Sequence, residues 1–333
     1  MSASAAAPTG RAPQRIVPGA DLDLLVLGDC NPDLILRGDE VEPAFGQAER
    51  LVDSADLTIG GSGAITACGA ARLGLRTAIA GVLGDDEFGR FMVQALRERG
   101  VETAGLVVDT RARTGLSVIL SRDQDRAILT FPGAIAALET GAIDPALLAR
   151  ARHVHVSSYF LQAALAPGLG PLLGEVRSRG GTTSVDPNWD PSERWDGGLR
   201  ELLADVDVLL PNAVEAVRIA GDGDPLQAAQ RLAALGPLVA VKLGAEGAVA
   251  VRAGGDPVSV RAPVVGAALD TVGAGDSFDA GVLAALLDGQ SVGRALALGC
   301  ACGALSTRAV GGTAAQPTLV EAIEALAEVE GTA

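Results

Sequence analysis

The stretch LDTVGAGDSFDAG, residues 269–281, is the most informative part of this chain of 333 residues. Two glycines, Gly273 and Gly275, stand just before Asp276, and an Ala- and Leu-rich helical pattern follows. A glycine turn that opens a helix presents backbone N–H groups without helical partners, and such groups bind anions like phosphate. The helix dipole favours the ionised form of Asp276, so we expect this carboxylate to accept a proton. The pattern predicts an anion cradle beside a base, although an ordinary N-cap turn uses the same residue types.

The whole stretch resembles the C-terminal signature of the ribokinase-like (PfkB) carbohydrate kinases. In that family the Gly-Ala-Gly segment is the anion hole and the aspartate is the catalytic base. The resemblance implies these roles for Gly273, Ala274, Gly275 and Asp276. It covers roughly residues 22–328. It implies transfer of phosphate from ATP, with Mg²⁺, to a hydroxyl of a small sugar or polyol.

Composition argues against several classes of protein. The net charge is −15 and the pI is about 4.6, which disfavours binding to nucleic acid or to an anionic membrane. The sequence has no apolar run of the ~20 residues that a membrane-spanning helix needs. Four cysteines without a CxxC pair and only two histidines disfavour a zinc site and indicate a reduced, cytoplasmic protein. Residues 1–20, rich in Ala, Pro and Gly, are predicted to be a disordered tail.

Strand-like apolar runs alternate with helical patterns over most of the chain. This alternation predicts a mostly parallel sheet with helices on both faces, an α/β fold with three α/β/α layers over residues 21–333. Strands are expected at 24–27, 77–81, 153–156, 183–185, 208–210 and 239–243. Helices are expected at 62–73, 86–99, 144–151, 166–178, 212–220, 225–235, 276–288, 291–307 and 318–328.

Two segments, residues 34–59 and 105–130, interrupt the alternation. They contain short strand-like pieces, among them Leu106–Val108, with no helix between them. We expect antiparallel strands that form a small sheet beside the main domain. The resemblance implies that this sheet is a lid over the sugar site and, as in some members of the family, a homodimer interface.

The segment GGSGAITACGAARLG, residues 60–74, opens a predicted helix with a glycine-rich turn. It resembles the family's N-terminal signature, which implies that Gly61, Ser62 and Gly63 bind substrate hydroxyls through the backbone. Close packing of a helix on a sheet would need the same glycines. Ile65 stands where many ribokinase-like sugar kinases have a sugar-binding asparagine, which argues against ribose itself. The sequence contains neither a P-loop nor a complete GxGxxG fingerprint.

Further substrate contacts are expected at Asn31, Asp33 and Tyr159. Asn31 and Asp33 follow the first strand, and ligands of open α/β sheets bind at the carboxyl ends of strands. A carboxylate there accepts hydrogen bonds from two hydroxyls of a polyol, whereas a solvated turn aspartate has no such role. The family places a substrate-binding aspartate at this point, which favours Asp33. Tyr159 follows a later strand and is expected to shape the sugar pocket.

Nucleotide contacts are expected in the second half of the chain. Asn212 and Glu215 share a helix face, and Asn212 alone fits an N-cap. The family's N-x-x-E motif implies that Asn212 acts at the phosphates and that Glu215 holds Mg²⁺ through water, because Mg²⁺ keeps several waters. The resemblance also implies a turn that lines the nucleotide, formed by Lys242, Gly244, Glu246 and Gly247. It implies an adenine pocket lined by Cys300.

A monovalent cation site is a further implication of the resemblance. Asp270 and the Val272 carbonyl match positions that hold such a cation in some family members. The loop at residues 306–312 would supply further carbonyls, although its length departs from that of simple ribokinases. The cation in question is K⁺.

Three alternatives to a sugar kinase stay open at this point. A nucleoside kinase of the same fold would need stacking partners, and a phosphosugar kinase would need arginines near the lid. A catalytically silent sugar-binding regulator would agree with the changed residue Ile65. Candidate stacking residues are Phe45, Phe131, Tyr159 and Phe160. Candidate phosphate-binding residues are Arg111, Arg113, Arg122 and Arg126.

Overall fold

A computed structural model of the chain describes residue 17 and residues 19–122 and 125–331. Most of the tail predicted for residues 1–20 lies outside these residues. Among the helices that are described, none is both long enough and apolar enough to cross a membrane.

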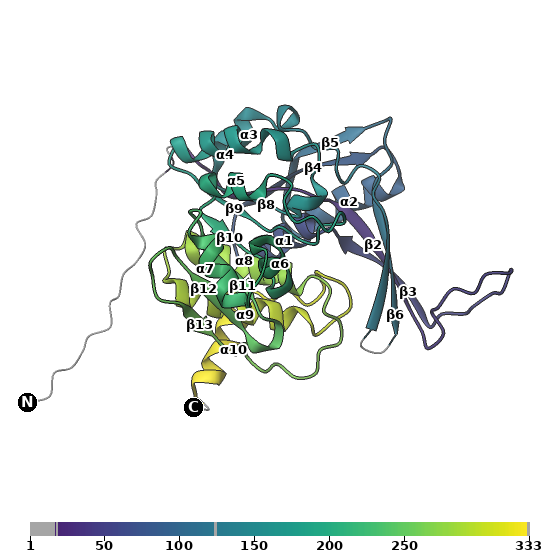
Figure 1. Ribbon diagram of the computed structural model, residues 1–333. Coiled ribbons are helices and arrows are strands. Elements are labelled where there is room, and N and C mark those ends of the chain that lie inside the picture. The colour runs from purple at the N-terminus through teal and green to yellow at the C-terminus, as the bar shows by residue number, and fades with distance from the viewer. Residues whose placement is uncertain (1–16, 18, 123–124, 332–333) are drawn as a thin grey trace, which may run out of the picture.

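The centre of the fold is a nine-stranded sheet in the order β13–β12–β11–β10–β9–β8–β1–β4–β5 (Figure 1). The strands from β11 to β5 run parallel, while β12 and β13 are antiparallel at one edge. Strand β1 reads LDLLVL and is buried at every position, as expected for a parallel strand covered on both faces. The strands are β1 (Leu22–Leu27), β4 (Thr77–Gly84), β5 (Glu102–Asp109), β8 (Ala151–Val156), β9 (Thr182–Val185), β10 (Val208–Leu209), β11 (Leu238–Lys242), β12 (Ala248–Val251) and β13 (Val258–Val260).

Helices cover both faces of this sheet and enclose two separate apolar cores. One core lies under the helices α1, α2, α8, α9 and α10, and the other lies under α3 to α7. The predicted three-layer α/β/α fold is therefore confirmed. The helices are α1 (Ser62–Arg72), α2 (Glu87–Glu98), α3 (Pro145–Arg150), α4 (Leu169–Ser178), α5 (Leu199–Leu202), α6 (Ala213–Ala220), α7 (Pro225–Ala233), α8 (Ala274–Leu287), α9 (Val292–Ser306) and α10 (Leu319–Gly331).

A second sheet of four strands, here called the lid, stands beside the main domain in the order β3–β2–β6–β7 (Figure 1). The predicted lid is confirmed, with two corrections. Leu106–Val108 belongs to β5 of the main sheet, because β4, α2 and β5 form a βαβ unit whose second strand returns beside the first. The lid is also not wholly antiparallel, because β2 and β6 run parallel. Its strands are β2 (Asn31–Arg37), β3 (Ser54–Gly60), β6 (Leu116–Arg122) and β7 (Asp125–Phe131).

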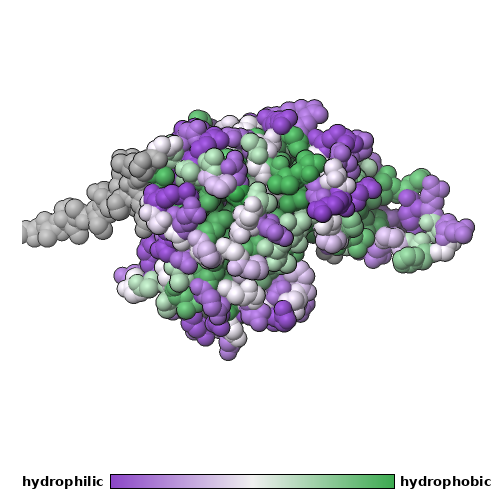
Figure 2. Space-filling model, turned by 90° about the horizontal axis from the view of Figure 1, so that it is seen from above, coloured by the Kyte–Doolittle hydropathy of each residue, from purple (hydrophilic) through white to green (hydrophobic). Residues whose placement is uncertain are grey.

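The segment that joins β2 to β3 projects from the body of the molecule. Seen from above, this projection carries both hydrophobic and hydrophilic residues on its surface (Figure 2). Phe45 is fully exposed there, and Leu51 is 84% exposed.

The parallel strands bring distant parts of the chain to one edge of the main sheet. The segments that follow β1, β8, β9, β10 and β11 all leave the sheet at its carboxyl edge, where ligands bind in folds of this kind. The lid and the first turn of α8 meet the same edge, so this is where most of the predicted site residues come together (Figure 1).

Candidate active site

The glycine turn before Asp276 opens a helix, as the sequence predicts. Gly273 is the N-cap of α8 and has the left-handed backbone angle φ = 72°. A methyl group at this position would press against the backbone of Gly312, so the site admits only glycine. The N–H groups of the first turn, including those of Gly275 and Asp276, have no helical acceptor and remain available to an anion.

Asp276 lies in this first turn and is almost closed to solvent, with 9% exposure. Burial raises its pKa well above the usual value, and the nearby charge of Asp186 raises it further. The helix dipole favours the ionised form, as expected, but loss of hydration outweighs it here, so the net pKa is raised. A raised pKa makes the ionised carboxylate a stronger proton acceptor.

Asp33 and Asn31 lie side by side on one face of β2, the lid strand, and are both buried. Burial, followed by the charge of Asp29, raises the pKa of Asp33 to about 7. The carboxyl of Asp33 packs directly over the Cα of Gly60, at the end of β3, where any side chain would overlap it. Asp33 is thus held at the start of α1.

The turn at residues 61–63 is organised differently from the expectation. Asp29, which the sequence reading missed, accepts hydrogen bonds from the backbone N–H groups of Ser62 and Gly63, both at 2.9 Å. These two donors are therefore used within the protein and do not face a substrate. The turn instead offers the hydroxyl of Ser62, which accepts a hydrogen bond from Asn188 at 3.1 Å and also bonds to Asp276.

Ile65, the departure from the family pattern, fills space under the catalytic turn. Its side chain lies against Gly273 and Gly312. The residue is 3% exposed, so it acts in packing.

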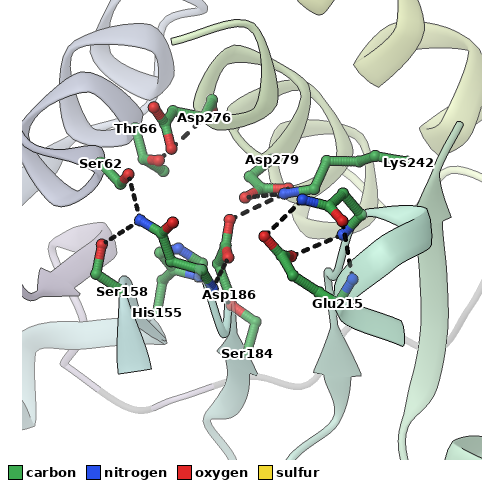
Figure 3. Close-up of polar contacts among 12 residues, drawn as sticks. Ser62, Thr66, His155, Ser158, Ser184, Asp186, Glu215, Lys242, Asp276 and Asp279 are labelled. Atoms are coloured by element: carbon green, nitrogen blue, oxygen red, sulfur yellow. Dashed lines mark hydrogen bonds and ion pairs between the residues drawn. The ribbon is translucent and has the colours of Figure 1, made fainter. Parts of the chain in front are cut away.

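Lys242 lies between two buried carboxylates that the sequence reading also missed, Asp186 and Asp279 (Figure 3). Its Nζ atom is 2.9 Å from Asp186 and 3.1 Å from Asp279. The Lys242 side chain is 13% exposed, so it is not a solvated surface lysine. The ammonium also lies near the anion hole, since a methyl group on Gly275 would be 3.6 Å from it.

The two carboxyls that flank Lys242 have pKa values shifted in opposite directions. Burial would raise the pKa of Asp186, but the charge of Lys242 and hydrogen bonds lower it to about 2. Burial raises the pKa of Asp279 well above its usual value. The contact between the two carboxyls lowers the pKa of Asp186 and raises that of Asp279. Asp186, Asp276 and Asp279 each place an oxygen within 4.8 Å of the others.

Asn212 and Glu215 form a capping box at the start of α6. The Asn212 side chain accepts from the Glu215 N–H at 2.9 Å, and Glu215 accepts from the Asn212 N–H at 2.8 Å. The capping role that the sequence left open for Asn212 is confirmed. Burial and the charge of Asp186 raise the pKa of Glu215 to about 7, so Glu215 faces the same charged cluster (Figure 3).

A cavity of about 410 Å³ lies on the far side of the anion hole. Gly244, Gly247 and Cys300 line it, together with Ala274 and Gly275 of the catalytic turn. Its walls are mostly small and apolar, which suits the flat face of an aromatic base. Glu246 lies in the same turn, but its side chain is exposed and is not among the lining residues.

Tyr159 does not join the other predicted residues. Its hydroxyl donates to the Gly197 carbonyl at 2.7 Å, and the ring packs edge-on against Phe160. Both rings line a separate hollow of about 670 Å³ near α4 and α5. Tyr159 was predicted as a site residue because it follows a strand. After that strand, however, the chain turns away from the sheet edge, and Tyr159 goes with it.

The sequence does contain a pattern that could have identified Asp29 and Asp186 as site residues. Each lies one or two residues beyond a buried parallel strand, Leu22–Leu27 for Asp29 and Thr182–Val185 for Asp186. This is the rule that pointed to Asp33. Asp279 had no such signal, because on sequence it is one polar residue inside an apolar helix.

Comparisons with known proteins agree with this geometry. The family described as pfkB family carbohydrate kinase matches residues 21–319. An uncharacterised sugar kinase from Archaeoglobus fulgidus is 32% identical and covers 67% of this chain and 88% of its own. An ATP-dependent ribose-1-phosphate kinase from Halopiger xanaduensis is also 32% identical, over 85% of this chain and 91% of its own. The crystal structure of a PfkB protein from Polaromonas sp. JS666 is 28% identical, with a TM-score of 0.76 over 91% of this chain and 99% of its own.

Proposed function

The chain belongs to the pfkB family of carbohydrate kinases, and we propose that it transfers the terminal phosphoryl group of ATP to a hydroxyl of a small sugar or polyol. One observation carries the proposal. Asp276 lies between the turn that opens α1, through its bond to Ser62, and the cavity lined by Ala274 and Gly275. A base in that place can reach a hydroxyl on one side and a phosphate on the other.

The chain's own residues divide the chemistry among them. Asp33 and the Ser62 hydroxyl orient the sugar, and ionised Asp276 takes the proton of the attacking hydroxyl. A bond forms between that oxygen and the phosphorus as the bond from phosphorus to ADP breaks. The N–H groups of Gly275 and Asp276 stabilise charge on the transferring group, and the Ala274 N–H, which donates to the Thr271 carbonyl at 3.4 Å, would have to leave that acceptor to join them.

The residues present also fit Mg²⁺. Magnesium prefers carboxylate oxygens and keeps several waters, and Glu215 offers a carboxylate at the edge of the cluster. Glu215 would hold the ion through water, because Asp186 is already paired with Lys242 at 2.9 Å. When bound, Mg²⁺ neutralises charge on the phosphate oxygens.

The surroundings of Asp33 favour an uncharged substrate over a phosphosugar. Each of the four arginines proposed for a phosphate already faces a carboxylate of the chain, and the fourth, Arg126, lies 3.9 Å from Asp270. Arg111 pairs with Asp109, Arg113 with Asp86 and Arg122 with Glu42. Asp33 instead has the carboxylate of Asp29 beside it, which would repel a second anion.

A nucleoside is also less well supported than a sugar. Phe45 is fully exposed on the projecting segment, and Phe131 is 52% exposed. Tyr159 and Phe160 line the separate hollow near α4. Stacking partners therefore do not gather at Asp33.

The experiment is an assay of ADP release with Mg·ATP over sugars, sugar phosphates and nucleosides. We expect turnover on an uncharged sugar or polyol.

Asp276→Asn should lower kcat by about 10²–10³ or more while ATP still binds, because removing one transition-state contact of this type costs that much. Asp288→Asn, an exposed aspartate at the other end of α8, is the matched control. Near-full turnover of Asp276→Asn would refute the assignment of the base. Sugar binding without ADP formation would favour the silent regulator.

We further propose that the lid pairs with a second copy of the chain. Exposed apolar side chains on the lid support this, including Leu57, Leu129 and Phe131, each more than 40% exposed. Light scattering coupled to gel filtration measures the mass, and a monomer at working concentration would exclude the pairing.

A further inference from the structure

The carboxylate of Asp270 is surrounded by donors of the chain itself. Its Oδ1 atom accepts the N–H of Val272, and its Oδ2 atom accepts the N–H of Gly311, both at 2.9 Å. The nearby carbonyl of Thr307 accepts two N–H groups, from Leu269 at 2.8 Å and from Asp270 at 3.1 Å. Both carboxylate oxygens of Asp270 and the Thr307 carbonyl, which were expected to bind a monovalent cation, therefore already accept hydrogen bonds.

Two arginines of the lid approach the same carboxylate. Arg37 Nη2 lies 3.8 Å from Asp270 Oδ2, and Arg126 Nη1 lies 3.9 Å from Oδ1. Arg126 Nη1 also donates to the hydroxyl of Thr271 at 2.8 Å. The sheet register explains their convergence, because Arg37 pairs with Ser121 and Ser121 pairs with Arg126, which puts both arginines on one face of the lid.

This arrangement does not fit a bound monovalent cation. Such an ion is held by several oxygens that replace its hydration shell. At Asp270 it would meet two N–H groups and two guanidinium charges within 4.0 Å of the carboxylate. Like charges at this distance repel, so the expected K⁺ site is already filled by the protein.

We propose that Arg37 and Arg126 take the place of a monovalent cation at Asp270, and that phosphoryl transfer by this chain does not depend on K⁺. The proposal rests on the proposed kinase activity. The two guanidinium groups balance the charge of Asp270 from the lid side. Asp270 and Thr271 lead directly into the anion hole at Gly273, so the arginines are positioning residues that tie the lid to the catalytic turn.

The first test compares the wild-type protein in K⁺ and in tetramethylammonium at equal ionic strength. We expect kcat to agree within about twofold and the melting temperature to be the same in both salts. An increase of about tenfold or more in kcat with K⁺ would overturn the proposal. So would a specific rise of the melting temperature in K⁺, which needs no turnover and stays informative even if no substrate is found.

The second test removes the charges with Arg37→Gln and Arg126→Gln, singly and together. We expect the double variant to lose about tenfold or more in kcat and to regain activity with added guanidinium or K⁺. Recovery by a cation separates lost charge from misfolding, which no cation would repair. Arg122→Gln is the control, because Arg122 ends a neighbouring lid strand but pairs with Glu42.

The outcomes separate this proposal from the proposed function. Turnover with strict dependence on K⁺ would leave the kinase and refute the arginine substitution. Full activity of the double variant without any cation would also refute it. Absence of turnover on all substrates would contradict the kinase, while the melting temperature in the two salts still decides whether Asp270 binds K⁺.

Discussion

The ammonium of Lys242 lies 2.9 Å from the carboxylate of Asp186, in a place where both side chains are largely closed to solvent. Lys242 is the only lysine of the chain, which otherwise uses arginine for its positive charges. A lysine ammonium is compact and can contact two carboxylates from between them, whereas the planar guanidinium of arginine needs more room. This explains why the one lysine stands here, with Asp279 as its second partner.

Lys242→Met should strongly destabilise the protein. The change leaves Asp186 and Asp279 buried without their counter-charge, and breaking a buried pair in this way costs about 3–5 kcal/mol. Urea unfolding followed by circular dichroism measures the loss. The double variant Lys242→Met/Asp279→Asn should recover part of it, because one of the unpaired carboxylates is then gone. A single variant as stable as the wild type would show that Lys242 does not hold the cluster.

Amine labelling gives a check on the native protein. Because Lys242 is the only lysine, an amine-reactive ester should modify only the terminal amine in the folded state and add a second label in urea. Mass spectrometry counts the labels. Rapid labelling of Lys242 in the folded protein would contradict its burial.

Gly60→Ala should impair the use of sugar and leave ATP binding intact. A methyl group at residue 60 would overlap the carboxyl of Asp33, which can rotate away because it ends a side chain. The fold should therefore survive while Asp33 is displaced. A misplacement of about 1 Å in a binding group can cost up to about 10²-fold in rate, so we expect kcat/KM for the sugar to fall by about 10–100-fold.

Steady-state kinetics with the sugar varied measures this effect, and ATP affinity is measured separately by calorimetry. Gly141→Ala is the matched control, because nothing lies within 4 Å of the added methyl group there. An unchanged kcat/KM for Gly60→Ala would remove Asp33 from the sugar site.

Stability and activity should respond to pH in opposite directions. The pKa values of Asp33 and Glu215 are raised to about 7, so between their ordinary values near 4 and pH 7 the folded chain holds more protons than the unfolded chain. The free energy of unfolding should therefore fall as pH rises through about 7, by up to a few kcal/mol at about 1.4 kcal/mol per pKa unit. The rate should instead rise with pH, because Asp276 must lose its proton to act as a base.

Urea unfolding at pH 6 and pH 8 and the pH profile of kcat/KM measure the two trends. Asp33→Asn should flatten the stability profile, whereas Asp39→Asn, at an exposed position after β2, should not. A stability that rises over this range would contradict the raised pKa values.

Most of the fold could be predicted from the sequence, because parallel strands and their helices leave strong local patterns. The nine long helical patterns and the buried strands appear where periodicity places them. Leu106–Val108 was misassigned because a sheet-edge strand is only half buried and looks like a lid strand. The parallel pairing of β2 with β6 was not predicted because it is a long-range contact without a local signal.

The site could be predicted only where a motif or strand end marked it. Asp276 and Glu215 face the same cluster of polar side chains, as their patterns indicate (Figure 3), and Gly273 is the N-cap of the helix whose first turn holds Asp276. Asp279 carried no such mark, because it acts through its contact with Lys242, 37 positions away, and that contact follows only from the three-dimensional structure.

The path of the chain at Gly61 has a mechanical consequence. Strand β3 of the lid ends at Gly60 and α1 begins at Ser62, so a single residue, with φ = 77°, joins the lid to the main domain. No spare length exists at this junction, and a swing of the lid must be taken up by backbone rotation at this glycine. That rotation turns Ser62 and Gly63 relative to Asp29. A rotation at Gly61 would therefore move the end of the lid strand and the substrate turn together.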